Sequence, residues 1–493
     1  MKKTNRICIV LFTLALTTSL PLLANNISID GDVTLTDQNT TEDYTNIKFD
    51  ISWENSWRTN DLNGDGITNW DAAWVFAKYR VGSGAWAHCT LSSTDGDHTA
   101  PTGSTIDAAS DGTGIFIYRS AVGVAGSVDW NNAKLRWNYG TDLVADDATV
   151  DVKVFAIEMV NIPQGNFYLG DGSSYGTFRI VASNTPVQIT TTGVVVKCED
   201  TSYDDTQLES DGILVDGDGG ISYTDNTTID NANYPTGYEA FYCMKYEISQ
   251  GQYVDFLNTL TSDQDATRYM TDTGYRHGAW GGSPGSRTTG IPNRACNYLS
   301  WADGAAYSDW AGLRPMTELE FEKACRGTKA AVAGEYAWGS TIVEATTISG
   351  AENGTETVNG NCNYSWGSDF SGGDGGRGPL RCGIFATSIS TRAEAGASYY
   401  GVMEMSGNLQ ERSVTLGNAT GRTFTGTHGN GAIDDSGNAD AASWPGTNAS
   451  GAGFRGGGWR NDATYLLVSG RCYAAHTHAN RYYDYGFRSA RTK

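Results

Sequence analysis

Hydrophobic and polar positions alternate with a period of two over several short stretches in the first third of the chain. In the clearest of them, residues 47–53, isoleucine, phenylalanine, isoleucine and tryptophan alternate with lysine, aspartate and serine. Similar runs occur at residues 74–81, 115–118, 134–139 and 150–154. This period predicts β-strands with one buried face. Several short strands joined by turns are typical of a β-sandwich, so we expect an all-β sandwich domain over residues 25–154.

The predicted sandwich is rich in tryptophan: Trp53, Trp57, Trp70, Trp74, Trp86 and Trp137. We interpret these side chains as core residues, because large aromatic rings dominate buried packing. A carbohydrate-binding aromatic face is the alternative.

Three helix starts can be read after residue 240. Ser249 precedes apolar residues at helical spacing, and Ser300 precedes a second such run. The clearest start is a capping box, in which the Thr317 side chain accepts from the Glu320 amide and the Glu320 side chain reaches back. Gly327 is expected to end that helix. Beyond residue 330 the sequence predicts loops and short strands.

The amino terminus has the pattern of a secretory signal peptide. Lys2, Lys3 and Arg6 precede an apolar run at residues 7–16, and Ala24 supplies a small residue at a cleavage position. We therefore expect residues 1–24 to be removed and the mature protein to be secreted or periplasmic. Later apolar stretches are too short to span a bilayer, so no membrane insertion is expected.

The chain is strongly acidic. It has 34 Lys+Arg against 56 Asp+Glu, a formal net charge of -22. Phosphate backbones and anionic lipid surfaces would be repelled, which excludes a role in nucleic-acid binding or at an anionic membrane. Solubility is one interpretation of this charge and cation binding is the other.

Residues 61–66 resemble a calcium loop, since Asp61, Asn63 and Asp65 occupy alternate positions before a glycine. The closing acid comes one place early, at Asp71, with Ala72 where a carboxylate is expected. A calcium site and an ordinary turn therefore both stay open. Residues 216–220 are a weaker version of the same pattern.

Cysteine usage points to an oxidising compartment. Of the 9 cysteines, Cys8 lies in the predicted signal peptide, and the even number that remains favours disulfides. No CxxC motif occurs, so a zinc ribbon or a thioredoxin-like centre has no support.

A series of ordered motifs in the second half resembles the formylglycine-generating enzyme (sulfatase-modifying factor) family over about residues 156–493. The motifs lie at residues 159–167, 245–249, 300–303, 310–320, 405–408, 455–459 and 486–488. The resemblance implies an irregular fold of the α+β class that is related to C-type lectins and contains structural calcium. We therefore expect a formylglycine-generating-enzyme-like domain over residues 155–493, preceded by the sandwich.

The same resemblance bears on catalysis. Catalytic members carry two cysteines, five residues apart, that bind copper and oxidise a substrate cysteine to formylglycine. Two thiolates are needed there because Cu(I) is soft and prefers sulfur. The matching positions here are Asn461 and Leu466, so copper and formylglycine-forming oxidase chemistry are not expected.

The resemblance also implies crosslinks. Cys472 matches a family cysteine that bonds to the one ending the Thr-Glu helix, here Cys325, which implies a Cys325–Cys472 disulfide. A second family disulfide would join the positions that Ser308 and Ser489 occupy here. Both of its ends are absent together.

The calcium elements of the family are better retained. The resemblance places calcium ligands at Glu404, Gly407, Leu409 and Glu411, two carboxylates and two backbone carbonyls of the hard type that calcium takes. A second family site would begin near Asn361. The alternative for the two glutamates is a pair of solvated carboxylates.

The last segment is rich in residues that form binding surfaces. We predict a surface composed of Trp459, Tyr465, His476, His478, Arg481, Tyr482, Tyr483 and Tyr485. The bland alternative is that about half of these aromatic residues are core. The segment also resembles the diversified ends of lectin-fold proteins altered by retroelements.

Two hypotheses of function follow. The first is an exported, calcium-stabilised module without oxidase chemistry that binds a protein or a glycan. The second is an oxidase or sulfatase-maturation-type enzyme that uses other pocket residues, with His476 and His478 as the first candidates.

Overall fold

The computed structural model describes residues 26–172, 177–180, 185–190, 197–199, 213–215, 227–228, 231–278, 280–353, 355–365, 376–387 and 389–493. At residues 179–180, 197–199, 213–215 and 227–228 only the backbone is described. The predicted signal peptide and the acidic pattern at residues 216–220 lie outside the described residues.

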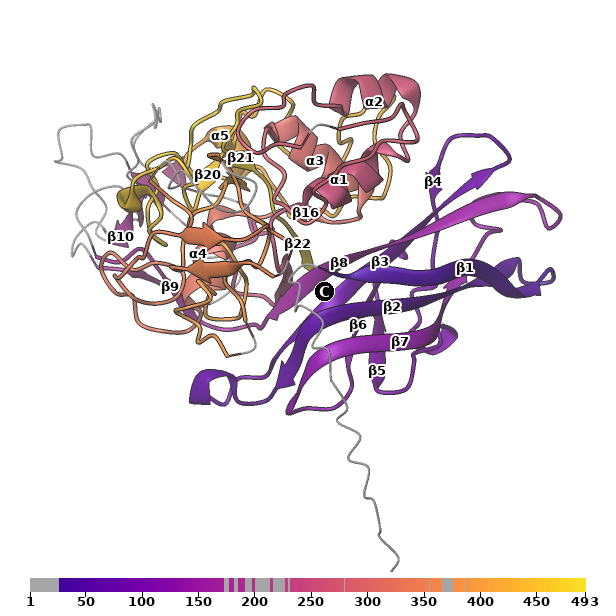
Figure 1. Ribbon diagram of the computed structural model, residues 1–493, viewed down its shortest axis with the longest axis horizontal. Helices are drawn as coiled ribbons and strands as arrows, with labels where there is room; N and C mark the ends of the chain where they lie inside the picture. The colour runs from indigo at the N-terminus through magenta and orange to yellow at the C-terminus, as the bar shows by residue number, and fades with distance from the viewer. Residues whose placement is uncertain are drawn as a thin grey trace, which may run out of the picture.

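The amino-terminal part is built from strands β1 (Ser28–Asn39), β2 (Tyr44–Thr59), β3 (Asn69–Val81), β4 (Ala87–His88), β5 (Ser104–Ala108), β6 (Ile115–Arg119), β7 (Val124–Trp137) and β8 (Val150–Ile162). Short 3-10 turns lie at Leu62–Gly64 and Asp95–Asp97. The strands that the alternating pattern predicts are therefore confirmed. Figure 1 shows them together in indigo and magenta, beside the more irregular carboxy-terminal part.

The carboxy-terminal part mixes short strands with helices. Its strands are β9 (Phe167–Leu169), β10 (Phe178–Ile180), β11 (Val187–Ile189), β12 (Lys197–Glu199), β13 (Ile213–Val215), β14 (Thr227–Thr228), β15 (Phe241–Met244), β16 (Arg314–Pro315), β17 (Thr347–Ser349), β18 (Thr357–Asn359), β19 (Gln410–Val414), β20 (Ala452–Arg455), β21 (Tyr485–Gly486) and β22 (Ser489–Thr492). Its helices are α1 (Gln250–Leu257), α2 (Ser262–Arg268), α3 (Trp301–Trp310), α4 (Glu318–Arg326) and α5 (Ala419–Arg422), with a 3-10 turn at Ala463–Tyr465. The described chain is thus a mixed, sheet-rich structure compatible with the α+β class.

The three predicted helix starts are confirmed. Ser249, Ser300 and Thr317 each form a capping box with the residue three places on, and Gly327 ends α4. The helix α2 was not predicted, although Thr261 and Gln264 form a capping box of the same kind. No helix in the described part of the chain has both the length and the apolar character needed to cross a membrane.

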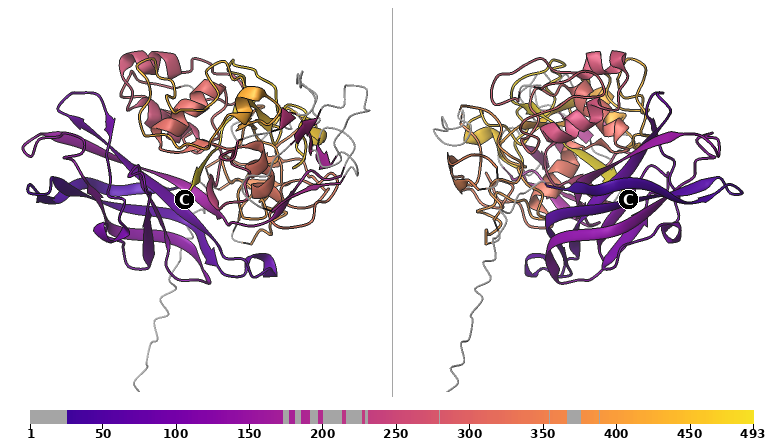
Figure 2. Two further views of the ribbon diagram at one scale, coloured as in Figure 1. Left: turned by 180° about the vertical axis from the view of Figure 1, so that it is seen from behind. Right: turned by 45° about the vertical axis from the view of Figure 1, so that its right-hand side comes forward.

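One sheet runs through both parts of the chain. Its strand order is β1-β2-β3-β8-β15-β22-β16, so β8 pairs with β3 of the amino-terminal part and with β15 of the carboxy-terminal part. Figures 1 and 2 show β8 extending from one part into the other. The predicted boundary between residues 154 and 155 consequently falls inside a strand.

The strand β3 is buried on both faces, and its alternate side chains serve two cores. Ala73, Val75 and Ala77 pack in one core with β2, β6 and β7. Ala72, Trp74 and Phe76 pack in a second core with residues of α1 and α3. Because successive side chains of a strand point to opposite faces, one face of β3 packs against β2 and β7 and the other faces the helices (Figure 1).

The predicted calcium loop at residues 61–66 contacts the carboxy-terminal part. Asp61 Oδ1 accepts from the Gly66 amide at 2.7 Å, as in a turn. Asp65 pairs with Lys329 Nζ at 2.6 Å and accepts from the Tyr399 hydroxyl. Asp71 is buried and accepts from the Trp57 amide at 2.9 Å. These contacts favour the turn, with Asp65 joining two parts of the fold.

Candidate functional site

The segment after β20 forms a buried loop. The Trp459 amide donates to the Asn408 carbonyl at 2.8 Å, and the Trp459 side chain is buried. The backbone of this loop requires glycine at position 457, where φ is 61°. A Cβ at this position would also lie 2.9 Å from the Leu466 side chain. The loop therefore brings residues 457–459 against residues 465–466.

The two positions predicted to replace the copper-binding cysteines hold structural side chains. Asn461 is buried, and its Oδ1 accepts from the Gly458 amide at 2.9 Å. Leu466 is fully buried in the core that contains Phe321 and Met405. An amide and an aliphatic side chain offer no thiolate, so the local chemistry does not suit a soft metal.

A small cavity lies beside this loop. It is lined by Gln410, Phe454, Arg455, Gly457, Tyr465, Gly470, Cys472 and Tyr473, and its volume is about 10 Å³. That volume holds about one water molecule.

Cys325 ends the buried face of α4. Burial raises the pKa of its thiol well above the usual range. Cys325 keeps a free thiol, so the implied Cys325–Cys472 disulfide is not formed in this structure and stays a prediction.

The carboxy-terminal part of the chain matches a known protein family. The family described as "Sulfatase-modifying factor enzyme 1-like domain" matches residues 197–493, more than half of the chain. The chain belongs to this family.

Two curated relatives are formylglycine-generating enzymes. The protein of Streptomyces coelicolor is 44% identical over 66 residues, which are 13% of this chain and 20% of the relative. The protein of Thermomonospora curvata is 42% identical over 59 residues, 12% of this chain and 19% of the relative. This family member thus spans about a fifth of the length of the curated relatives it matches.

The predicted calcium positions of this sulfatase-modifying-factor-like protein include two buried glutamates. Glu404 Oε1 accepts from the Gly383 amide at 2.7 Å, while its Oε2 is buried and has no hydrogen-bond partner among the described residues. Burial raises the pKa of Glu404 to about 7, although Arg488 acts to lower that pKa. Both carboxylate oxygens of Glu411 accept from Arg488, the closer at 2.6 Å.

A third buried carboxylate, that of Glu247, lies against the same loop. It accepts from the Leu409 amide at 2.8 Å and from the Asn408 side chain. Burial, and then the charge of Glu411, raise the pKa of Glu247 well above its usual range. Three buried carboxylates thus interact with Arg488, and Arg381 also acts on Glu404. Buried negative charge in such excess is stabilised by a hard cation.

This loop carries part of the oxygen donor set that calcium takes. Gly407 has a φ of 89°, and a Cβ there would lie 2.4 Å from Cys362 Sγ, so the loop follows a course that only glycine allows. The part of the chain that the structure describes holds no group of three or more His, Cys, Asp or Glu side chains arranged for a metal. Calcium here would therefore need the carbonyls of Gly407 and Leu409 besides Glu404, with Glu411 shared with Arg488.

Asn361, the predicted start of a second calcium site, is used structurally. Its Oδ1 accepts from the Glu344 amide at 3.0 Å, and its Nδ2 donates to the Ala393 carbonyl at 3.0 Å. With both ends of the amide engaged, Asn361 braces two loops.

The structure divides the predicted binding surface. Trp459 and Tyr485 are buried and belong beneath the surface, which corrects their assignment as contact residues. Arg481 is half-buried and held by Asp303 at 2.7 Å. Tyr465, His476, His478 and Tyr483 are half-buried, and Tyr482 is 37% exposed.

We define the aromatic face as Tyr275, His476, His478, Tyr482 and Tyr483. The ring centroid of Tyr483 lies 4.3 Å from that of Tyr275 and 4.2 Å from that of Tyr482. The rings of His476 and His478 are stacked with 5.7 Å between centroids. Tyr275 is 41% exposed. The face therefore combines ring surface that solvent can reach with rings held in place by stacking.

Arg460 fixes the two tyrosines of the face. Its guanidinium lies 5.4 Å from the ring centroids of both Tyr482 and Tyr483, and Nη1 donates to the Tyr483 hydroxyl at 2.6 Å. Arg460 Nε also lies 3.1 Å from Asp484 Oδ2. These contacts hold two large side chains in one arrangement before any ligand arrives.

In and next to the aromatic face, some polar atoms of the described residues are buried without hydrogen-bond partners. Within the described chain, Arg412 Nε and Nη1, His478 Nδ1 and Asp484 Oδ1 make no hydrogen bond. Arg412 lies 3.8 Å from the Phe454 ring centroid, and burial lowers its pKa to about 9. Each buried polar group without a partner costs free energy. A ligand that accepts from Arg412 and donates to Asp484 would remove that cost.

Sequence reasoning missed three of these residues. Glu247 lies inside the family motif at residues 245–249, so the motif could have drawn attention to it. The motif does not show that the Glu247 side chain is buried. Arg412 directly follows Glu411, the last of the predicted calcium ligands. Tyr275 lies far from the carboxy-terminal segment in sequence, and only the fold brings it to Tyr483.

Proposed function

We propose that this member of the sulfatase-modifying factor family is an exported binding module that has lost copper oxidase chemistry. Its aromatic face would hold a protein or glycan ligand, and calcium would stabilise the loop that supports the face. A lectin-like carboxy-terminal fold and an amino-terminal β-sandwich would position this surface.

One observation carries the proposal: Arg412, His478 and Asp484, which lie in or next to the aromatic face, have buried polar atoms without hydrogen-bond partners among the described residues. Aromatic rings give contact area at low entropic cost, and buried polar groups give orientation once a ligand pairs with them. A ligand with both apolar surface and hydrogen-bonding groups would satisfy both. Peptide and sugar surfaces have this character.

The residues at the family's copper positions support the loss of oxidase chemistry. The Asn461 side chain accepts a hydrogen bond within a turn, and the Leu466 side chain packs in a core. A metal site at these positions would disrupt both contacts. Cys472 borders the small cavity, but two sulfur ligands are needed for the family's copper site.

Calcium, when bound, would neutralise the buried carboxylates. Glu404 would turn its unpartnered oxygen to the ion, and the carbonyls of Gly407 and Leu409 would complete the set. The loop continues directly into β19, which carries Gln410 and Arg412. Ordering this loop would therefore fix the polar cluster under the aromatic face.

A binding comparison tests the proposal. The purified full chain is offered to an immobilised glycan panel and to a displayed peptide library, beside Tyr482→Ala, Arg460→Ala and the control Ile342→Ala, whose side chain is 66% exposed elsewhere. We expect one class of ligand to be retained by the wild type and the control and lost by about tenfold or more in the two face variants. Equal retention by all four proteins would contradict the proposal.

The competing enzymatic hypothesis relies on His476 and His478, whose stacked rings could approach a metal from one side. It predicts tight copper or zinc binding that is lost in His476→Ala and His478→Ala. The binding hypothesis predicts no such metal and no oxygen uptake with a cysteine peptide.

A further inference from the structure

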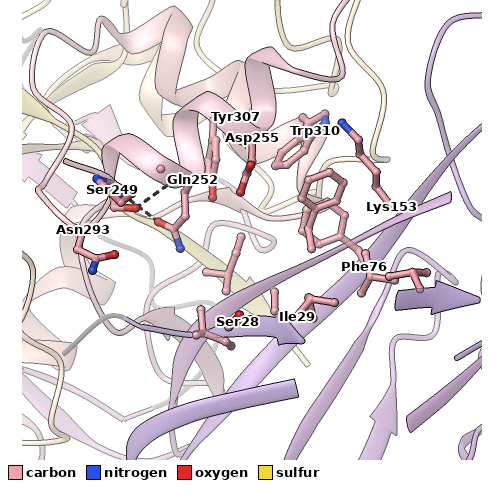
Figure 3. A pocket seen from close by; sticks show the side chains of 18 of the residues that line it. Ser28, Ile29, Phe76, Lys153, Ser249, Gln252, Asp255, Asn293, Tyr307 and Trp310 are labelled. Carbon is pink, nitrogen blue, oxygen red and sulfur yellow. Dashed lines mark hydrogen bonds between the residues drawn. The ribbon is translucent and has the colours of Figure 1, made fainter. Parts of the chain in front are cut away.

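A cleft away from the aromatic face lies between the amino-terminal strands and the helices. It has a volume of about 490 Å³ and is bordered by β1, β8, α1, α3 and the loop at residues 292–293. Figure 3 shows Asp255 between Tyr307 and Trp310, above the strand that carries Ser28 and Ile29. Segments from distant parts of the sequence thus form a single recess.

The edge of β8 is open along this cleft. The strand β15 pairs with β8 only from Met159 to Ile162. One further bond, from the Lys245 amide to the Glu158 carbonyl at 2.9 Å, ends the pairing. In the ladders of the described residues no other strand takes this side of β8 before Met159.

The direction of the open backbone groups follows from that last bond. In an antiparallel strand, alternate residues direct their N–H and C=O groups to the same side. The Glu158 carbonyl points towards β15, so Ala156, Val154 and Val152 present their backbone groups to that side as well. All three residues border the cleft. This stretch is roughly 13 Å long, enough to pair with a short extended peptide.

The two walls of the cleft differ in character. One wall is apolar and belongs to, or packs against, the core between the amino-terminal strands. It is made by Val152, Val154, Ile29 and Val33. Lys153 and Phe155, which point to the other face of β8, lie on the side of α1 and α3. In a peptide strand placed beside β8, every second side chain would therefore contact the apolar wall. The side chains between them would contact the polar wall.

The polar wall holds the carboxylate of Asp255. Asp255 makes no ion pair or hydrogen bond to the described residues, and solvent reaches its side chain. Burial among neighbouring groups nevertheless raises the pKa of Asp255 to about 6, with Lys153 acting in the opposite direction. Lys153 Nζ donates to the Asn258 carbonyl at the end of α1 at 3.5 Å and lies 4.8 Å from the Trp86 ring centroid. A carboxylate beside Tyr307 and Trp310 is complementary to an incoming cation.

We propose that this cleft binds an extended peptide, which adds a strand to the open edge of β8 and places a lysine or arginine side chain against Asp255. Strand addition at a free sheet edge gives affinity through the main chain and specificity through alternate side chains. The occupant would alternate apolar and polar residues, with the basic side chain on the polar face. The formal net charge of -22 also favours a basic partner.

Labelled peptides test the proposal by fluorescence anisotropy on the purified full chain. The probe is a heptapeptide that alternates valine and threonine around one central lysine. Two twins of the probe carry N-methyl groups on alternate amides, one twin for each of the two possible registers. A third twin replaces the lysine by norleucine. We expect saturable binding of the probe and a loss of roughly tenfold or more for one N-methylated register. The norleucine twin should lose several-fold.

Two protein variants separate the contributions. Asp255→Asn should weaken the lysine probe by the same factor as the norleucine substitution and leave the norleucine twin unchanged. Asp147→Asn, a change at an exposed loop position, is the matched control and should bind as the wild type does. Because the peptide twins leave the protein unaltered, the test holds even if a variant folds poorly.

Other outcomes would overturn the proposal. Equal binding of the probe and both N-methylated twins would exclude strand addition. Competition by N-acetyl-lysine methylamide as strong as that by the probe would indicate a site for a small cation. Absence of binding at millimolar probe would show that the edge is not a docking site. Sedimentation of a dimer that the probe dissociates would show that a second copy of the chain covers the edge.

Discussion

The hydroxyl oxygens of Ser308 and Ser489 lie 2.7 Å apart in the buried core, although 181 residues separate them in the chain. The sequence resemblance places these residues at the two ends of a disulfide found in the family. Their proximity supports the alignment of the motifs from which the other site residues were assigned. A hydrogen bond between serines here joins the end of α3 to β22.

Restoring the crosslink is the first prediction. Ser308→Cys together with Ser489→Cys should form a disulfide under oxidising conditions and stabilise the chain by about 2–4 kcal/mol, because the bridge constrains the unfolded state. Thiol counting and urea unfolding measure the two effects. The same double variant under reducing conditions is the control. Two persistent thiols after oxidation would contradict the alignment.

The second prediction concerns calcium. Calcium added to chelator-treated protein should raise the urea midpoint. The free energy of unfolding should increase by about 2.7 kcal/mol at a calcium concentration one hundred times its dissociation constant. Glu404→Gln should lose most of this gain because it removes the unpartnered carboxylate oxygen. Glu42→Gln, at an exposed position, should respond as the wild type does. An unchanged response of Glu404→Gln would remove Glu404 from the site.

The third prediction concerns Lys78, whose ammonium is buried and donates to the Trp310 carbonyl at 2.7 Å and to the Gly431 carbonyl. Burial lowers the pKa of Lys78 from 10.5 to about 7. Between these values the unfolded chain binds one more proton than the folded chain at this residue, so the free energy of unfolding rises with pH. The contribution is at most about 1.4 kcal/mol per pH unit.

Urea unfolding at pH 7 and pH 8.5 measures this effect. The gain in stability with pH should be smaller in Lys78→Met than in the wild type, since every other group titrates in both proteins. An equal gain in the two proteins would show that Lys78 stays charged in the folded chain.

The fourth prediction is that the two parts of the chain unfold together. Trp74 of β3 is fully buried against the helices, and its Nε1 donates to the Ala311 carbonyl at 2.7 Å. Trp74→Ala should cost about 3–5 kcal/mol. Hydrogen exchange should then lose protection in β7 and in α3 alike. Loss in only one of the two elements would show two independent domains.

Local signals in the sequence predicted much of the secondary structure. The capping residues Ser249, Ser300 and Thr317 mark helices because their side chains satisfy amides that a helix start leaves free. The alternation of hydrophobic and polar residues predicted the strands, because successive side chains of a strand point to opposite faces. The helix α2 could have been found by the same logic from Thr261 and Gln264.

Long-range relationships could not be read from those signals. The alternating pattern of β8 does not reveal that its two ends pair with different partners, so the boundary near residue 154 was placed inside a strand. The burial of Trp459 and the exposure of Tyr482 depend on which segments cover them, and residue type alone does not distinguish the two. For the same reason nothing in the sequence placed Tyr275 beside Tyr483.

Copper loading with oxygen uptake tests the central claim most directly. The purified wild-type chain is titrated with Cu(I) against a chelating competitor, and oxygen consumption is followed with a cysteine-containing peptide. With Asn461 and Leu466 at the metal positions, we predict no stoichiometric copper that resists the competitor and no oxygen uptake above the peptide alone. Tight copper at one equivalent together with peptide-dependent oxygen consumption would contradict the account.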